Sequence, residues 1–481
     1  MRRSLIRSLP AIGLFVSVHA TAFAQNGPTS QPTPSDQAFI TRLFDLYAAE
    51  LNPLPPAPAD QSAQAPSGRR STIPPAPLNS PPWPWAEWPY NGAPVIGGST
   101  PNSSGGNLMK ALSGTGFGNF LKDNNVEIYG WVDAGFNLST SQGKFGNLPA
   151  GYDFKSNSGQ LNQSVIYVER MEDTTQQDHI DWGFRLIGLY GTDYRYTTMD
   201  GVFSNQLTHR NDVYGGDLPN FYYDLYIPWI GEGSTLRVGR YGTLPDVEAD
   251  LDLQNPFDTH SMYYTYDPFT QMGLVWSTRL SKNWVVQVGV NAGNDAAVWS
   301  NSAKPTLTAC LQWNSDSSRD NVYLCDNDTN DANYAYNNVN LYVVTWYHKL
   351  TDRLWFATED YYEYENNVPT VSTVAGANPA LCSTGRHCWA GAYAFSGYLM
   401  YQLADKDYVG LRQEAFDDAR GQRTGFKTWY TETTLGWVHW LTPSIEVRPE
   451  LRYDHSYNAL TYDNGTKRDQ FAFALDMLVK F

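Results

Sequence analysis

Charged and apolar side chains alternate along the segment SIEVRPELRYD, which begins at Ser444. Glutamate and arginine occupy every second position, at Glu446, Arg448, Glu450 and Arg452. An extended strand points successive side chains to opposite faces, so one face of this segment would be charged and the other apolar. Placing either arginine near the middle of a lipid bilayer would cost roughly 2–4 kcal/mol. The charged face is therefore expected to look into water or into a polar interior.

Other segments with the same alternation place further charged side chains on such an inward face. These are Arg185, Asp224, Arg237, Arg412 and Glu414. Two roles stay open for each of them: lining a passage for solutes, or forming internal salt bridges that only brace the structure.

A third group of charges lies in the segment GTLPDVEADLDLQNPFDTHSMYYTYDP, residues 242–268. Its acids stand two residues apart, at Asp246, Glu248, Asp250 and Asp252. If this segment folds inward, its carboxylates could face Arg185, Arg237, Arg448 or Arg452. If it stays outside, it is a solvated acidic loop, and the sequence leaves both positions open.

Catalytic motifs are absent from the sequence, which has no GxSxG, HExxH or phosphate-binding P-loop pattern. His260 stands next to Ser261, but adjacent residues rarely align as base and nucleophile. We therefore expect no enzyme, no catalytic residue and no cofactor.

Four cysteines allow three pairings. The short separations favour Cys310 with Cys325 and Cys382 with Cys388, each closing an external loop in an oxidising compartment. Because no CxxC spacing occurs, no metal site is expected.

The N-terminal quarter of the chain differs in composition from the rest. Residues 1–24 carry three arginines, an apolar stretch and an Ala-Phe-Ala site, the pattern of a cleaved signal peptide. Residues 25–106 are rich in proline and are expected to be mostly disordered in the periplasm, with a short helix near 36–51. Residues 107–125 form a lead-in to the remaining chain.

Residues 126–481 break into about fourteen segments with a period of two, joined alternately by long and short connections. Short turns on one side and long loops on the other are typical of an antiparallel up-and-down transmembrane β-barrel. An even strand number places both ends of the barrel in the periplasm. The pattern defines the number of strands only to within two. Residues 295–336 are interpreted as a single long external loop.

The motifs VEIYGWVDAGFNLSTS, YVERMED and TLRVGRYGTLPDVE, together with a last strand that ends on phenylalanine, resemble the β-barrel porin family of the OmpL-like type. The resemblance covers roughly residues 120–481. It implies an outer-membrane barrel that passes small hydrophilic solutes, and it supplies no catalytic residues. In general porins the third loop folds into the lumen, and residues 242–268 are the corresponding loop.

The last strand, QFAFALDMLVKF, alternates apolar residues up to Phe481. This pattern resembles the signal by which the barrel assembly machinery recognises outer-membrane barrels. We therefore expect Phe481 to act in assembly, and we expect the barrel to lie in the outer membrane of a Gram-negative bacterium, in contact with its lipid.

The net charge of the chain bears on which partners it can bind and on which ions it favours. The formal charge of −16 becomes −19 without Arg2, Arg3 and Arg7, so nucleic acid is not expected as a partner. The expected loop 295–336 would gather six aspartates at the external mouth and favour cations weakly. They are Asp295, Asp316, Asp320, Asp326, Asp328 and Asp331.

Two other functions remain open from the sequence. One is a structural outer-membrane barrel whose proline-rich arm contacts peptidoglycan, and the other is a plugged transporter for hydrophobic compounds. The solutes, the oligomeric state and whether the pore is open do not follow from the sequence.

Overall fold

The computed structural model describes residues 39–51, 96–97, 105–251, 253, 255–317, 319–369 and 387–481. The expected signal peptide and most of the proline-rich segment lie outside the described residues, and Asp252 and Cys382 do as well. Described residues from Phe39 onward belong to one compact unit.

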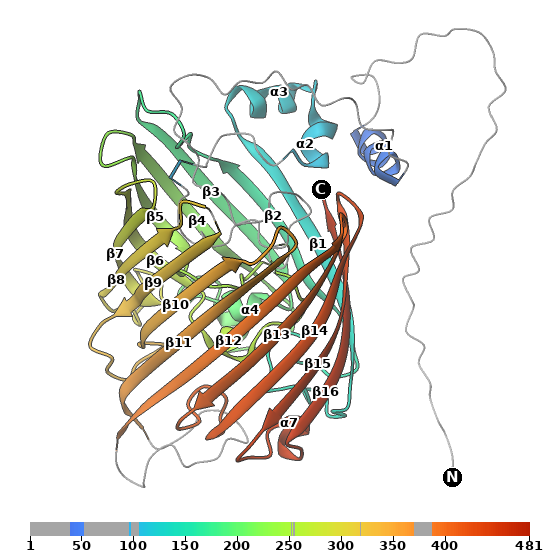
Figure 1. The fold of residues 1–481 in the computed structure, drawn as a ribbon, viewed down its shortest axis with the longest axis vertical. Coiled ribbons are helices and arrows are strands. Elements are labelled where there is room, and N and C mark those ends of the chain that lie inside the picture. Colours follow the sequence, from blue (N-terminus) through green and yellow to red (C-terminus); the bar gives the residue numbers. More distant parts are fainter. Residues whose placement is uncertain are drawn as a thin grey trace, which may run out of the picture. The chain divides into compact units, whose positions relative to one another are not determined.

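Sixteen antiparallel strands close into a barrel in which β1 pairs with both β2 and β16 (Figure 1). The strands are β1 Glu127–Ser139, β2 Gly159–Arg170, β3 Asp181–Gly191, β4 Gly215–Ile227, β5 Ser234–Gly242, β6 Thr270–Arg279, β7 Trp284–Asn294, β8 Thr306–Asn314, β9 Asp320–Thr329, β10 Asn340–Lys349, β11 Leu354–Val368, β12 Cys388–Ala404, β13 Asp407–Asp418, β14 Thr428–Thr442, β15 Ile445–Ser456 and β16 Asp469–Lys480. The predicted fold class is confirmed.

The predicted count of about fourteen strands is two too low, because the hairpin of β8 and β9 was interpreted as part of a loop over 295–336. Both strands are short, with nine and ten residues. Several of their inward side chains are polar, as at Asn321, Asn327 and Asp328, and resemble loop composition. The turn between β8 and β9, which contains residues 315–317, lies at the short-turn end of the barrel.

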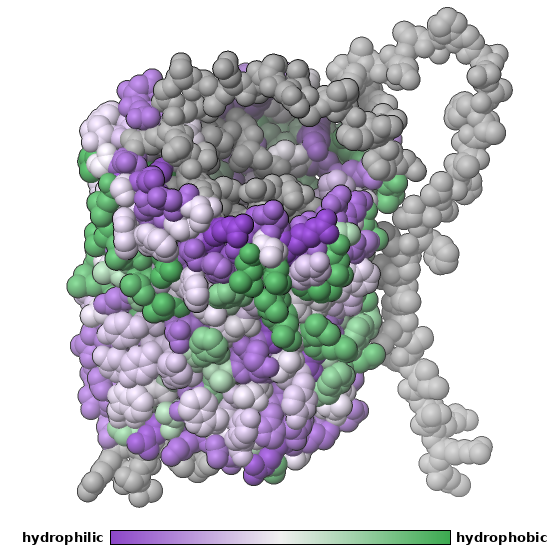
Figure 2. All heavy atoms as spheres, viewed as in Figure 1, coloured by the Kyte–Doolittle hydropathy of each residue, from purple (hydrophilic) through white to green (hydrophobic). Residues whose placement is uncertain are grey.

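Each strand separates its side chains between two environments. On β14, Trp429, Leu435 and Trp437 are exposed on the outer wall, whereas Glu432 and Thr434 are 1% and 0% exposed on the inner wall. Figure 2 shows apolar residues gathered on the outer wall. An apolar band of this kind with tryptophan and tyrosine near the strand ends is what a barrel presents to lipid.

Short helices accompany the barrel. At the short-turn end, α1 (Phe39–Leu51), α2 (Asn107–Leu112) and α3 (Gly116–Asp123) lie near the end of β16 (Figure 1). The Tyr47 hydroxyl donates to the carbonyl of Lys480 at 2.5 Å. The loops carry α4 (Tyr194–Thr197), α5 (Asn205–Thr208), α6 (Met262–Tyr266) and α7 (Tyr462–Gly465). Among the described residues, no helix has the length and apolar character needed to cross a bilayer.

Phe481 lies at the seam where β1 meets the end of β16. Its backbone N–H donates to the carbonyl of Gly130 at 2.9 Å, and its carbonyl accepts from the Gly130 N–H at 3.3 Å. A Cβ atom on Gly130 would lie 2.9 Å from the Phe481 ring, so the glycine leaves room for the ring to lie against β1. The role of Phe481 in assembly stays a prediction.

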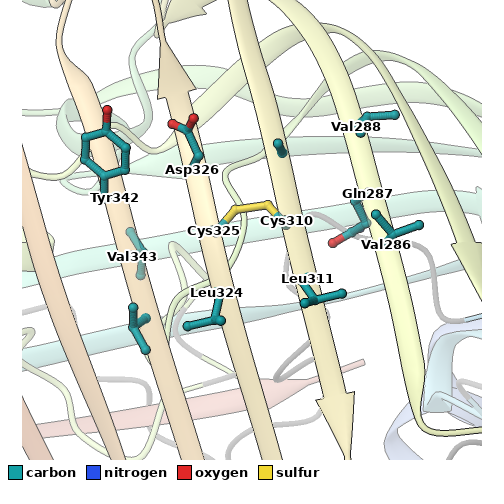
Figure 3. Close-up of a pocket in the computed structure, with 12 residues that line it drawn as sticks. Val286, Gln287, Val288, Cys310, Leu311, Leu324, Cys325, Asp326, Tyr342 and Val343 are labelled. Carbon is teal, nitrogen blue, oxygen red and sulfur yellow. A yellow bond between two sulfur atoms is a disulfide. The ribbon is translucent and has the colours of Figure 1, made fainter.

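The predicted bond between Cys310 and Cys325 is present, but its predicted position in an external loop is wrong. The two residues are direct cross-strand partners on β8 and β9 (Figure 3). They are 4% and 5% exposed and belong to an apolar cluster on the inner wall with Leu244 and Tyr323. Cys388 is also disulfide-bonded, at the start of β12, and its pairing with Cys382 stays a prediction.

We expect reduction of the Cys310–Cys325 bond to lower the stability of the barrel wall itself, because the bond joins two of its strands. For the 15-residue separation, the chain-entropy estimate is about 3 kcal/mol. Urea unfolding of the detergent-solubilised barrel with and without reductant measures this loss. The double variant C382S/C388S should retain the effect of reductant, whereas an unchanged midpoint in the natural chain would contradict the prediction.

Candidate functional site inside the barrel

The described part of the third loop between β5 and β6, residues 243–251, 253 and 255–269, lies inside the barrel. Leu244, Val247, Phe257 and Tyr263 are each 0–1% exposed. Val247 and Phe257 pack in one apolar cluster with inward side chains of β10 to β14, including Trp355 of β11. Of the two positions that the sequence left open for this loop, the structure therefore shows the inner one.

A buried ion pair between Glu248 and Arg412 holds the middle of the loop against β13. The Arg412 Nη1 atom lies 2.8 Å from Glu248 Oε1, and its Nε lies 3.0 Å from Glu432 on β14. Glu248 also accepts from the Tyr398 hydroxyl at 3.0 Å and from the Ser261 N–H at 3.0 Å. One loop carboxylate thus links two strands of the wall with the loop's own backbone.

Carboxylates of the wall bind the loop backbone in return. Glu414 accepts from the N–H groups of Met262 and Tyr263, both at 2.7 Å, at the start of α6. Glu359 accepts from the Val247 N–H at 2.8 Å. Each of these hydrogen bonds pairs a backbone N–H in a buried setting, where an unpaired donor would be costly.

The β15 side chains that the alternation placed inside are buried there, and each of its arginines pairs with an acid. Arg448 pairs with Asp476 on β16 and donates to the carbonyl of Asn255 at 2.9 Å. Arg452 lies 2.8 Å from Asp454 and also contacts the third loop through the carbonyl of His260. Glu450 accepts from the Thr259 hydroxyl.

Arginines of the wall contact the third loop, but mostly through groups other than the predicted loop acids. Arg448 and Arg452 meet carbonyl oxygens of the loop, and the described loop acid that meets an arginine, Glu248, meets Arg412. Glu446 is inward and 1% exposed. A role in permeation for any of these side chains stays a prediction.

The third loop covers the inner wall from β1 to β4 only in part. Trp131, Ile187 and Leu251 pack there in one buried cluster, whereas Tyr129, Arg185 and Tyr222 are only half-buried. Arg185 lies 2.6 Å from Glu169. On the neighbouring β5, Arg237 pairs with Asp224 at 2.7 Å.

Cations and aromatic rings alternate in this less covered region. The Arg237 guanidinium lies 3.7 Å from the centre of the Tyr222 ring, and that of Arg185 lies 5.9 Å from it. Tyr129 stacks on Tyr167 at 4.7 Å. The sequence marked the charges here but not the tyrosines, since inward tyrosines are not distinguishable from girdle tyrosines without the register.

Three carboxylates form a group that could hold a metal ion, although none was singled out as a site from the sequence. They are Asp133 of β1, Asp258 of the third loop and Asp476 of β16, and their oxygens lie within 4.8 Å of one another. The amide of Asn162 donates to Asp133 at 2.9 Å and to Asp258 at 3.0 Å. These residues are far apart in the sequence, so only the closed barrel brings them together.

The expected cluster of six aspartates at one mouth does not form. Asp316 and Asp320 lie at the short-turn end, whereas Asp326, Asp328 and Asp331 lie toward the long-loop end of β9. Asp295 is 6% exposed, where it accepts from the Thr270 N–H at 2.9 Å. A cation preference cannot rest on that cluster.

Burial changes the pKa values of the loop acids in different directions. For Asp250, burial and then the charges of Asp246 and Asp295 raise the pKa to about 8. For Glu248, burial acts to raise the pKa, but Arg412 and His260 outweigh it and lower the pKa to about 2. Of these two acids, Glu248 is therefore ionised beside an arginine and Asp250 keeps its proton at neutral pH.

Comparison with known proteins identifies one family. The family model described as "Putative beta-barrel porin-2, OmpL-like" matches residues 125–481. No curated protein matches the chain.

Several solved structures are similar over 74% of this chain. An anion-selective porin from Comamonas acidovorans matches over 99% of its own chain, with 9% identity and a TM-score of 0.46. The outer membrane channel DcaP of Acinetobacter baumannii matches over 97% of its chain, with 12% identity and a TM-score of 0.47. With TM-scores this low, the likenesses carry no argument about function.

We expect the free energy of unfolding to fall between pH 5 and pH 8, in part through Asp250. This carboxyl keeps its proton in the folded barrel up to pH about 8, whereas its ordinary pKa in an unfolded chain is 3.8. Unfolding in this window therefore releases a proton, and one such group lowers stability by at most about 1.4 kcal/mol per pH unit. Urea unfolding of the natural chain and of D250N at several pH values measures the slope, which should be shallower in D250N.

D316N, which changes an exposed acid on the turn between β8 and β9, is the matched control for D250N and should keep the natural slope. Glu248 does not change the slope between pH 5 and pH 8. The stability that its ionised carboxylate contributes is present above its ordinary pKa of 4.5 and is lost only as the pH falls toward 2. Equal slopes in D250N and the natural chain would contradict the prediction.

Proposed function

This chain belongs to the OmpL-like β-barrel porin family and is an outer-membrane porin, and from that premise we propose that it lets small hydrophilic solutes diffuse passively along the inner face of β1 to β5. The observation that carries this proposal is a group of inward side chains, Tyr129, Arg185 and Tyr222, that the third loop leaves half-buried. Elsewhere the inner wall is closed, since Ile187 on β3 and Arg412 on β13 are both 0% exposed.

The chemistry of this route suits polar solutes. Arg185 and Arg237 present guanidinium groups next to carboxylates, and the tyrosines offer hydroxyl groups beside aromatic faces. A solute that gives up part of its hydration in a narrow passage needs such donors and acceptors along the wall. Because each arginine has an acid partner, the passage itself carries little net charge.

We propose a weak preference for cations, and it rests on the charge of the whole chain. The formal charge is −16 at pH 7, so the surrounding field attracts cations toward either entrance. Such a field is screened over about 10 Å at 0.1 M salt. In a salt gradient across a planar bilayer, we expect a reversal potential of cation-selective sign that shrinks as salt is raised, and an anion-selective sign would contradict the proposal.

Two alternatives fit fewer of the observations. A plugged transporter for hydrophobic compounds needs an apolar route, but the less covered wall is lined by arginines and tyrosines, and the apolar side chains inside the barrel are packed against the third loop. A structural barrel that contacts peptidoglycan through its proline-rich arm would conduct no ions.

We expect Tyr222→Ala to increase single-channel conductance, because it removes an inward ring beside Arg237 in the proposed route. Tyr223→Ala is the matched control, since Tyr223 is the next residue on β4 and is 45% exposed on the outer wall. Planar bilayer recordings of the purified barrels measure the steps. Silence in all three proteins would favour the structural barrel, and equal steps in all three would place the route elsewhere in the lumen.

A further inference from the structure

The outer wall carries the same four-residue cluster at three places. In each, a histidine and an aromatic residue two positions before it lie on one strand, and a basic residue followed by aspartate lies at the start of the neighbouring strand. The clusters are Trp346, His348, Arg319 and Asp320; Trp437, His439, Lys406 and Asp407; and Tyr453, His455, Arg468 and Asp469. The histidine and aspartate are direct cross-strand partners in all three.

The contacts within the clusters repeat as well. Histidine Nδ1 lies 2.6, 2.7 and 2.6 Å from aspartate Oδ1 in the three clusters. The same Oδ1 atom accepts from the indole N–H of Trp346 at 3.2 Å, from that of Trp437 at 3.0 Å and from the Tyr453 hydroxyl at 2.6 Å. Three separate stretches of the sequence therefore form the same arrangement of contacts.

The basic residue also repeats its position. Arg319 donates to the carbonyl of Leu350 at 3.3 Å, and Lys406 donates to that of Leu441 at 3.2 Å. Arg468 donates to the carbonyl of Tyr457. In every case the acceptor belongs to the second residue after the histidine, so the cation is held at the same strand end as the histidine.

All three clusters lie at the ends of strands on the lipid-facing side. The first two lie at the short-turn end of the barrel and the third at the long-loop end. Their aromatic residues are 41–43% exposed, and the histidine side chains are 27–28% exposed. They therefore continue the apolar band of the outer wall at the levels where lipid headgroups begin.

The chemistry of the cluster suits an anion. A carboxylate can only accept, so the histidine Nδ1 must carry a hydrogen, and Nε2 points away from the aspartate. In the imidazolium form, Nε2–H is a donor, and a guanidinium or ammonium group is held at the same strand end. Two cationic donors at headgroup level match the phosphoryl oxygens of a phospholipid, which are negatively charged acceptors.

We propose that each of the three clusters binds the phosphoryl group of a lipid headgroup, with the histidine Nε2–H and the adjacent arginine or lysine as donors. The acyl chains of that lipid lie along the exposed apolar residues of the same strands, such as Val344 and Leu435. The aspartate orients the imidazole through Nδ1, and the indole N–H or the tyrosine hydroxyl holds the aspartate in place.

The test uses the full-length barrel in detergent, stripped of lipid and then offered phosphatidylglycerol or a diacylglycerol with the same acyl chains but no phosphate. Native mass spectrometry measures the affinity of the retained lipid. We expect the natural barrel to prefer phosphatidylglycerol, and the triple variant H348F/H439F/H455F to bind it about tenfold more weakly, as expected for loss of a charge-assisted hydrogen bond. Binding of diacylglycerol should not change.

The control is H179F, because His179 also pairs with an aspartate, Asp178, at 2.9 Å, but belongs to no such cluster. If the triple variant fails to fold, R319A/K406A/R468A removes the exposed cations and leaves the histidine–aspartate bonds in place. Unchanged affinity for phosphatidylglycerol in that variant, or in the folded triple histidine variant, would overturn the proposal. Binding of inorganic phosphate as tight as that of phosphatidylglycerol would also overturn it, since the site would then belong to a soluble anion.

Discussion

Closure of β1 on β16 is the constraint from which the other features of this structure follow. Lipid offers no hydrogen-bond partner, so every backbone N–H and C=O group at membrane depth must be paired within the sheet. Phe481 and Gly130 complete that pairing at the seam. Once the sheet is closed, alternate side chains lie in two different environments: one set faces lipid, and the other is enclosed.

Enclosure then determines how the charges are arranged. An isolated ionised side chain is costly in a confined interior, so the inward arginines require acids within reach. Arg448 and Arg452 find theirs within the wall, but Arg412 also takes Glu248 from the third loop. The loop is therefore part of the charge balance of the wall and not an independent plug. Its apolar residues, such as Phe257, fill the space between these polar contacts.

The sequence predicted what depends on local periodicity and missed what depends on register. Alternation along SIEVRPELRYD was enough to place Arg448 and Arg452 inside, and connection lengths were enough to predict a barrel. The β8–β9 hairpin was missed because Asn321, Asn327 and Asp328 are tolerated inside the barrel but read as loop residues in a short segment. The contact between Glu248 and Arg412 spans 164 residues, and the group of Asp133, Asp258 and Asp476 joins the first and last strands to a loop. Local sequence patterns do not predict these contacts, because the contacts depend on how many strands separate the two residues around the barrel.

The way the loop is held also bears on how solutes pass. Contacts to Glu359, Glu414, Arg412 and Arg448 tie the loop to three different strands, so it cannot swing aside without breaking several buried polar contacts together. Breaking even one buried ion pair costs about 3–5 kcal/mol, which leaves the released state populated at about one part in a thousand. A route that depended on release of the loop would conduct only in rare bursts. Steady diffusion therefore requires a gap that is present while the loop is seated, and the half-buried inward side chains of Arg185 and Tyr222 lie where the loop does not fully cover the wall.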